Sequence, residues 1–375
     1  MHQDSKLSPA RRKSHLGILL VIILLLIVWA ADIYLYLDRE LSATKGAFAD
    51  GRPLTVSDFV AAKNLQLAGE SQGRTNVMIY GLTADGLRTD TMILASYYWQ
   101  QHKLVLLNIP RDLYANDNGY NTKIVSLYTL AKNQRPNDPS FPPQYVSDFI
   151  SREYGIPIHY WVVLNMQAFV QLIDSLGGLT VNVQRSFTDC LYPNADYTGY
   201  IRPCPHFSAG VQTMNGATAL IYARSRHSTD PLEGTDFARS KRQQIIIKAA
   251  LAKLKQQGAL TDLSKLDTYL KIFGANVYTN LTPPELVKSA QLASGLRAGQ
   301  DFIMANWSNQ DNFLCDSADA NGAYVLRYGT LGDCTGQAGV NDGSPYRQQA
   351  VNYVQNLLQS AAAASASGTP AAANQ

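Results

Sequence analysis

The sequence lacks the motifs of several common enzyme classes. No GxxxxGK[ST] segment indicates a nucleoside triphosphate site, and no GxSxG segment marks a serine-hydrolase nucleophile. Only four cysteines occur, none in a CxxC pair, and His159 and His206 stand alone, so no zinc-site spacing is present. The net charge of +3 over 375 residues is small, which predicts no nucleic-acid partner.

A long uncharged run stands near the N-terminus. Residues 16–31 carry no charged side chain, and the apolar character continues to Leu37. A helix over 16–37 is about 33 Å long, enough to cross a bilayer core. Four basic residues precede this run: Lys6, Arg11, Arg12 and Lys13. The positive-inside tendency therefore predicts a cytoplasmic tail over 1–15 and a single-pass cell-membrane protein whose remaining residues lie outside the cytoplasm.

An alternative interpretation of this run is a cleaved signal peptide, with Val28-Trp29-Ala30 as the processing site. Under either interpretation the chain is exported, and an even number of cysteines in an exported chain favours disulfides. The simplest pairing joins sequence neighbours, Cys190 with Cys204 and Cys315 with Cys334.

The rest of the chain is divided by composition. Residues 38–73 are mixed polar and predict a stalk, with a short helix capped by Ser57. Residues 74–360 show no repeat or linker and predict one extracytoplasmic domain. Residues 361–375, rich in Ala and Ser, predict a disordered tail.

Within 74–360, strand and helix patterns alternate. Apolar runs predict strands at 76–80, 91–98, 104–109, 160–164 and 179–183. A helix from Asn165 to the Gly177-Gly178 stop makes the last two strands a β-α-β unit. Further helices are predicted at 146–154, 236–257, 283–296 and 346–358. The alternation predicts an α/β fold, an α-β-α sandwich with a central mixed sheet, preceded by one N-terminal transmembrane helix.

Arginines and acids recur in four separate segments. The segments are Arg88-Thr-Asp90, Pro110-Arg111-Asp112, Arg224-Ser-Arg226 and Asp236-Phe-Ala-Arg239-Ser-Lys-Arg242-Gln243-Gln244. The first two stand at strand ends, where ligands bind in open α/β sheets. Guanidinium groups that converge there would bind a phosphate or pyrophosphate.

The helical segment has its own geometry. Arg239, Arg242 and Gln243 stand at i, i+3 and i+4 and share one helix face. Two arginines near a helix N-terminus oppose the helix dipole, an arrangement that an anionic ligand would stabilise. The alternative is a solvated basic face, or arginines paired with Asp230, Glu233 and Asp236.

These segments resemble the LytR-CpsA-Psr family of cell-wall glycopolymer ligases. The resemblance covers about 74–360. The matching pieces are Arg88-Thr-Asp90-Thr-Met-Ile-Leu, Asn108-Ile-Pro-Arg111-Asp112, Lys123-Ile, Asn165-Met-Gln-Ala-Phe-Val-Gln-Leu-Ile-Asp-Ser-Leu-Gly-Gly178, Leu220-Ile-Tyr-Ala-Arg224-Ser-Arg226 and Arg239-Ser-Lys-Arg242-Gln-Gln244.

The resemblance implies a phosphotransferase. Family members transfer a glycan phosphate from a polyprenyl-pyrophosphate carrier to a hydroxyl of peptidoglycan and release polyprenyl phosphate. The lipid tail lies in an apolar groove between sheet and helices. The alternatives to this activity are a polyprenyl-pyrophosphate pyrophosphatase and a non-catalytic protein that binds or senses polyprenyl phosphates.

The resemblance also assigns residues. The pyrophosphate would be held by Arg88, Arg111, Lys123, Arg224, Arg226, Arg239, Arg242 and a glutamine at 243 or 244. The catalytic residues would be Asp90, Arg111 and Asp112, with Asp112 as a second acid or as a partner that orients an arginine. Asp90, which would hold Mg²⁺ (or Mn²⁺) or activate the acceptor hydroxyl, would share the metal with Asp85.

The sequence departs from the family pattern at three places. The loop that normally carries a second metal-binding acid is shortened to Gly81-Leu-Thr-Ala-Asp85, where Thr83 stands as an alternative occupant. The residue before Arg239 is Ala238 instead of glycine. Val125-Ser-Leu-Tyr128 follows Lys123-Ile in place of the usual Asn-His-Ala-Tyr.

Overall fold

The computed structural model describes residues 11–194, 198–256, 271–297, 300–305, 314–319, 322–329 and 345–363. The helices are α1 (Arg11–Leu41), η1 (Ser42–Ala47), α2 (Val56–Ala61), η2 (Glu70–Gln72), α3 (Ile124–Gln134), α4 (Phe141–Tyr154), α5 (Met166–Ser175), α6 (Gly216–Arg224), α7 (Asp236–Gln256), α9 (Pro283–Gly295) and α11 (Pro345–Ala363). The strands are β1 (Arg74–Leu82), β2 (Thr89–Tyr98), β3 (Lys103–Asn108), β4 (Tyr114–Asp117), β5 (Tyr120–Lys123), β6 (Tyr160–Leu164), β7 (Leu179–Val183), β8 (Phe187–Thr188), β9 (His206–Phe207), β10 (Gly210–Met214), β11 (Val277–Thr279), β12 (Phe302–Ala305), β13 (Leu314–Ala318) and β14 (Tyr324–Tyr328).

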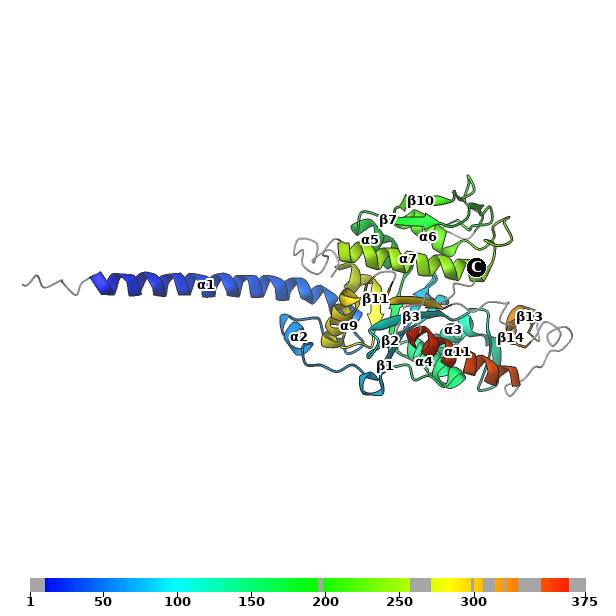
Figure 1. Ribbon diagram of the computed structural model, residues 1–375, viewed down its shortest axis with the longest axis horizontal. Coiled ribbons are helices and arrows are strands. Elements are labelled where there is room, and N and C mark those ends of the chain that lie inside the picture. Colours follow the sequence, from blue (N-terminus) through cyan, green and yellow to red (C-terminus); the bar gives the residue numbers. More distant parts are fainter. Residues whose placement is uncertain are drawn as a thin grey trace, which may run out of the picture.

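A six-stranded sheet in the order β11-β6-β1-β2-β3-β12 forms the centre of the domain (Figure 1). β1 pairs antiparallel with β2, and β2 pairs antiparallel with β3. The pairs β1–β6 and β3–β12 are parallel, so the sheet is mixed. The predicted strands at 76–80, 91–98, 104–109 and 160–164 are confirmed as β1, β2, β3 and β6.

Both faces of this sheet are covered. Side chains alternate along β1, so Met78 and Tyr80 pack into a core that α3, α4 and α11 complete. Ile79 and its pairing partner Ile93 face the opposite side, where Ile247 of α7 packs against the same cluster. The predicted α-β-α sandwich is confirmed. The α7 face of the sheet carries the site described below.

The predicted β-α-β unit is wrong in one respect. β7 forms at 179–183 but pairs with β10 in a separate two-stranded sheet instead of returning beside β6. Gly177 and Gly178 both have positive φ, and a Cβ on Gly178 would lie 2.9 Å from the Met214 carbonyl oxygen. This tight turn sets β7 against β10. With α6 and α7, these strands enclose a second core.

The segment predicted as a stalk packs against the domain. Phe48 forms a bridge with Thr279 of β11 and lies in an apolar cluster with Leu54 and Val287 of α9. α2 begins at Val56, one residue before the predicted capping residue Ser57. Thr55 is the actual cap, because Asp58 at the third helical position completes a capping box with it.

α1 extends away from the rest of the molecule in Figure 1. Large apolar side chains on it are exposed, among them Leu26, Ile27, Trp29 and Leu35. Among the described residues, no helix reaches the length and hydropathy expected of a membrane span. The transmembrane helix over 16–37 therefore stays a prediction.

At the other end of the chain, α11 continues past the predicted 346–358 to Ala363. It covers the first three residues of the predicted tail 361–375, and the other residues of that tail lie outside the described ranges.

Candidate functional site

Arg111 lies at the centre of a cluster of charges just after β3. Pro110 ends the strand, and the Arg111 side chain turns toward β2, where its Nη1 atom lies 2.7 Å from Asp90 Oδ1. Its Nε atom lies 3.3 Å from Asp112 and 3.9 Å from Asp236. Burial alone would lower the pKa of this guanidinium, but the three carboxylates outweigh burial and raise it. Arg111 therefore stays charged.

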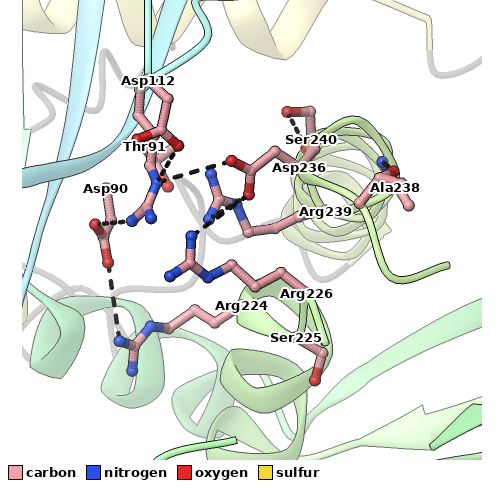
Figure 2. A network of polar contacts seen from close by, with 12 residues as sticks. Asp90, Thr91, Asp112, Arg224, Ser225, Arg226, Asp236, Ala238, Arg239 and Ser240 are labelled. Atoms are coloured by element: carbon pink, nitrogen blue, oxygen red, sulfur yellow. Dashed lines mark hydrogen bonds and ion pairs between the residues drawn. The ribbon is translucent and has the colours of Figure 1, made fainter. Parts of the chain in front are cut away.

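Arg224, the last residue of α6, and Arg226, in the loop that follows it, approach the same carboxylates. Figure 2 shows both side chains pointing toward Asp90 and Asp236. Arg224 Nη2 lies 3.9 Å from Asp90 Oδ2, and Arg226 Nη1 lies 3.9 Å from Asp236 Oδ1. Ion pairs this long leave a phosphate oxygen room to compete for the guanidinium groups.

Arg239 completes the cluster from the first turns of α7. Its Nη1 atom lies 3.0 Å from Asp236 Oδ1, its side chain is 7% exposed, and its buried Nε has no acceptor. Burial lowers the pKa of Arg239 to about 10; Asp236 opposes this shift and Arg111 adds to it. A buried cation with an unused donor is costly unless an anion binds it.

A cavity of about 440 Å³ connects these arginines to an apolar chamber. Its polar end is lined by Arg88, Arg111, Arg224, Arg226 and Arg239, with the carboxylates of Asp90 and Asp189. Its other end is lined by Ile79, Ile93 and Ile247, which pack in one cluster. Further apolar lining comes from Leu82, Leu164, Met166, Phe169 and Leu220. The arrangement suits a ligand with a strongly anionic group on a long apolar tail.

Three of the predicted pyrophosphate residues lie away from the cavity, and a fourth reaches only its rim. Arg242 donates to the carbonyl oxygens of Tyr222 and Ser225 and pairs with Glu233, so it holds the end of α6 and the start of the loop after it, which carry Arg224 and Arg226. Gln244 donates to the Ala305 carbonyl oxygen of β12. Neither these two residues nor Lys123 lines the cavity, and Arg88 reaches only its exposed rim.

The sequence left two assignments open: which glutamine, 243 or 244, faces the site, and what Asp112 does there. Gln243 lines the cavity and donates to Thr91 Oγ1 at 2.9 Å, so it is the glutamine of the 243–244 pair that faces the site. Lys123 Nζ lies 2.8 Å from Asp112. Burial raises the pKa of Asp112, but the Lys123 hydrogen bond and the Arg111 charge outweigh burial and lower it. Asp112 is thus held as an ionised partner of Arg111.

Arg242→Ala is expected to destabilise the domain by about 3 kcal/mol, because it leaves Glu233 and two carbonyl oxygens of a packed loop without their donor. Urea unfolding of the variant measures the loss. Lys241→Ala, on the exposed side of the same turn, is the matched control. A difference below about 1 kcal/mol between the two variants would contradict the structural role of Arg242.

Of the two predicted metal ligands, only one lies at the cavity. Asp90 lines the cavity, whereas Asp85 does not; its carboxylate accepts from Thr83 Oγ1 and the Leu87 amide, which lower its pKa. No group of three metal-binding side chains occurs in the part of the chain that the structure describes. Mg²⁺ is commonly held by one or two carboxylates together with substrate phosphates. Asp90 fits that requirement, and Asp85 would have to leave its turn to meet it.

A disulfide-linked insert, residues 188–207, contributes one wall of the cavity. The predicted Cys190–Cys204 disulfide is confirmed, and Tyr192 beside it lines the cavity. The buried Asp189 accepts hydrogen bonds from the backbone amides of Arg226 and His227, so the insert also fixes the arginine loop. For the predicted Cys315–Cys334 pair, Cys334 lies outside the described residues.

Two acids of the site were not assigned as site residues from the sequence: Asp236 was predicted only as an ion-pair partner of the arginines, which the structure confirms, and Asp189 was not predicted at all. Asp236 contacts Arg111, Arg226 and Arg239, and Asp189 fixes the loop. Asp236 had one sequence signal, its position at the start of a helix three residues before Arg239, where an i,i+3 pair is expected. Asp189 had none, because its contacts are made across 37 and 38 residues.

Comparison with known proteins identifies the family. The model of the LytR_cpsA_psr family matches residues 32–318, which is more than half of the chain. The chain belongs to the LytR-CpsA-Psr family. The predicted family is therefore confirmed.

One of two similar relatives is named for its reaction. The chain is 30% identical over 277 residues to the polyisoprenyl-teichoic acid–peptidoglycan teichoic acid transferase TagU of Oceanobacillus iheyensis, covering 72% of this chain and 77% of that protein. It is 31% identical over 214 residues to an uncharacterized Staphylococcus aureus protein, covering 56% of this chain and 47% of that protein. The predicted transferase class agrees with the name of the first relative.

Solved structures of LytR-CpsA-Psr proteins share the fold. Bacillus subtilis TagV has a TM-score of 0.52 at 20% identity, covering 76% of this chain and 97% of TagV. TagT bound to LIIa-WTA has a TM-score of 0.52 at 20% identity, covering 84% of this chain and 99% of TagT.

Proposed function

We propose that this protein transfers a glycan phosphate from a polyprenyl-pyrophosphate-linked glycopolymer to a hydroxyl of peptidoglycan and releases polyprenyl phosphate. The observation that carries the proposal is the continuity of the cavity, whose arginine end suits a pyrophosphate and whose apolar end suits a polyprenyl tail. The TagU relative, named as a teichoic acid transferase that uses a polyisoprenyl carrier and peptidoglycan, supports the same substrates.

The residues divide the work as follows. Arg224, Arg226 and Arg239 bind the pyrophosphate oxygens, and Arg239 gains the acceptor that its buried Nε lacks. Arg111 binds the phosphoryl group that is transferred, since it pairs with all three carboxylates at the centre of the cluster. Phosphoryl transfer depends chiefly on positioning and neutralisation of charge, which fixed guanidinium groups supply without a covalent nucleophile. Mg²⁺ (or Mn²⁺) held by Asp90 and the donor phosphates would supply further neutralisation.

The proposed topology places the donor within reach. In this proposal residues 16–37 span the cell membrane, residues 1–15 are cytoplasmic, and the domain lies outside. The exposed apolar side chains of α1, including Leu26 and Trp29, would then contact membrane lipid. A polyprenyl carrier in the outer leaflet would lie close to the domain.

The test is turnover by the full-length protein in detergent. With Mg²⁺, a polyprenyl-pyrophosphate glycan and peptidoglycan oligomers, the protein is expected to release polyprenyl phosphate and to label the oligomers with glycan. Equal release with and without oligomers would indicate a pyrophosphatase instead. Bound lipid without turnover under every metal condition would indicate a binding protein.

A further inference from the structure

A second, small cavity lies on the other side of the charged cluster. It has a volume of about 20 Å³, enough for one oxygen-sized group. Asp90, Arg111 and Arg239 line both cavities and so form a wall between them. Asp236, Phe237 and Leu326 line only the small one.

This inference rests on the proposed function, and it concerns the side from which the acceptor hydroxyl attacks the phosphorus. In phosphoryl transfer, the attacking and leaving oxygens lie roughly in line on opposite sides of the phosphorus. The lipid phosphate that leaves occupies the large cavity with its apolar tail. The attacking oxygen must therefore come from the side of the small cavity.

Asp236 is placed to receive an acceptor group there. Its Oδ1 atom is buried and has no hydrogen-bond donor, although Arg239 Nη1 lies 3.0 Å away in an ion pair without hydrogen-bond geometry. By contrast, Asp90 Oδ1 accepts a hydrogen bond from Arg111, and Asp112 accepts one from Lys123. Asp236 thus offers the small cavity a carboxylate oxygen to which a hydroxyl can donate, and unlike Asp90 it does not line the large cavity.

An exposed aromatic ring stands beside this cavity. Leu326 lines the cavity and is held by its backbone amide, which donates to the Asp112 carbonyl oxygen at 2.8 Å. Tyr324, two residues earlier on β14, projects from the same face of the strand. Its ring is 47% exposed and centred 5.5 Å from Lys123 Nζ. Burial raises the pKa of the Tyr324 hydroxyl. The hydrogen bond to Asp316 and the charges of Asp112 and Asp236 raise that pKa further.

The elements beside the two cavities extend toward opposite ends of the domain. α7 runs from the arginine cluster toward the end of the domain near α1, and β13 and β14 lie at the opposite end (Figure 1). A donor from the membrane and an acceptor from the wall would thus reach the phosphorus from opposite ends of the domain.

We propose that the small cavity is the acceptor subsite, where Tyr324 packs against a peptidoglycan sugar and Asp236 accepts the proton of the attacking hydroxyl. The hydroxyl oxygen forms a bond to the phosphorus next to the glycan. The bond from that phosphorus to the bridging oxygen breaks, and polyprenyl phosphate leaves with the electron pair. The proton passes from the hydroxyl to Asp236 and then to water or to the leaving phosphate.

The experiment separates donor binding, acceptor binding and turnover in the full-length protein. Asp236→Asn is expected to slow acceptor-dependent release by about 100-fold or more, with the donor Kd within about threefold of wild type, and Asp236→Glu to restore part of the rate. Tyr324→Ala is expected to weaken binding of peptidoglycan oligomers about tenfold at an unchanged donor Kd. Tyr200→Ala, with a similarly exposed ring on the disulfide-linked insert, should change neither quantity.

The proposal is overturned if Asp236→Asn keeps wild-type turnover, or if it loses donor affinity in proportion to rate. It is also overturned if Tyr324→Ala binds oligomers as Tyr200→Ala does. A wild-type protein without turnover would refute the proposed function alone. In that case, selective loss of oligomer binding in Tyr324→Ala would still support the acceptor subsite, and unchanged binding would refute it.

Discussion

Arg111→Ala is expected to lower the rate of polyprenyl phosphate release by about 10³-fold or more. Arg111 lines both cavities and forms ion pairs with Asp90, Asp112 and Asp236. Under the proposed function, its removal takes away the cation that binds the transferred phosphoryl group. It also leaves the negative charge of three carboxylates less neutralised. The site would then repel the anionic donor and would stabilise the transition state less.

Single-turnover rates with the lipid-linked donor measure this effect. Arg111→Lys is expected to recover only a small part of the rate, because an ammonium group cannot reproduce the separate contacts that Nε and Nη1 make. Arg152→Ala, which removes an exposed arginine paired with Asp117, is the control and should keep wild-type turnover. Turnover by Arg111→Ala within tenfold of wild type would contradict the role assigned to this residue.

Ile247→Glu is expected to weaken binding of a long-chain polyprenyl donor by about 100-fold. Ile247 lines the apolar end of the cavity and packs against the cluster of Ile93 and Leu106. A carboxylate there would have to be desolvated to accept the lipid tail, at a cost of about 3 kcal/mol. The chemistry at the arginine end would remain intact.

Two comparisons make this second experiment specific. A water-soluble donor with a short prenyl chain should bind Ile247→Glu and wild type with similar affinity, because it does not reach the chamber. Lys248→Glu places a carboxylate at the next, exposed position of α7 and should retain long-chain binding. Equal losses for short and long donors would show that the substitution acts through folding and would contradict an apolar tail site.

The sequence predicted the arginine cluster better than the orientation of each residue in it. Helical spacing correctly placed Arg239 and Gln243 on the cavity face of α7. The same spacing could not show that Arg242 turns toward the loop after α6, because that depends on carbonyl groups 17 and 20 residues away. The role of Lys123 likewise depends on a contact made only in the folded chain, its ion pair with Asp112.

In the fold as well, the sequence predicted features that depend on local patterns but not those that depend on tertiary contacts. Apolar periodicity and Pro110 identified the central strands, because both faces of those strands are buried. The pairing partner of β7 was not predictable, since its alternation suits any half-buried strand. The close approach of Gly178 to Met214, which places β7 beside β10, is a property of tertiary structure.

The shape of the large cavity limits how much of a lipid it encloses. From Arg239 to Ile247, α7 advances about 12 Å, less than half of the roughly 30 Å hydrocarbon thickness of a bilayer. The chamber would therefore shelter only the first part of a long polyprenyl chain, while the remainder stays dissolved in the leaflet. Under the proposed function the carrier would never need to be extracted completely. After transfer, the released polyprenyl phosphate would return to the membrane by withdrawing only this first part of its chain.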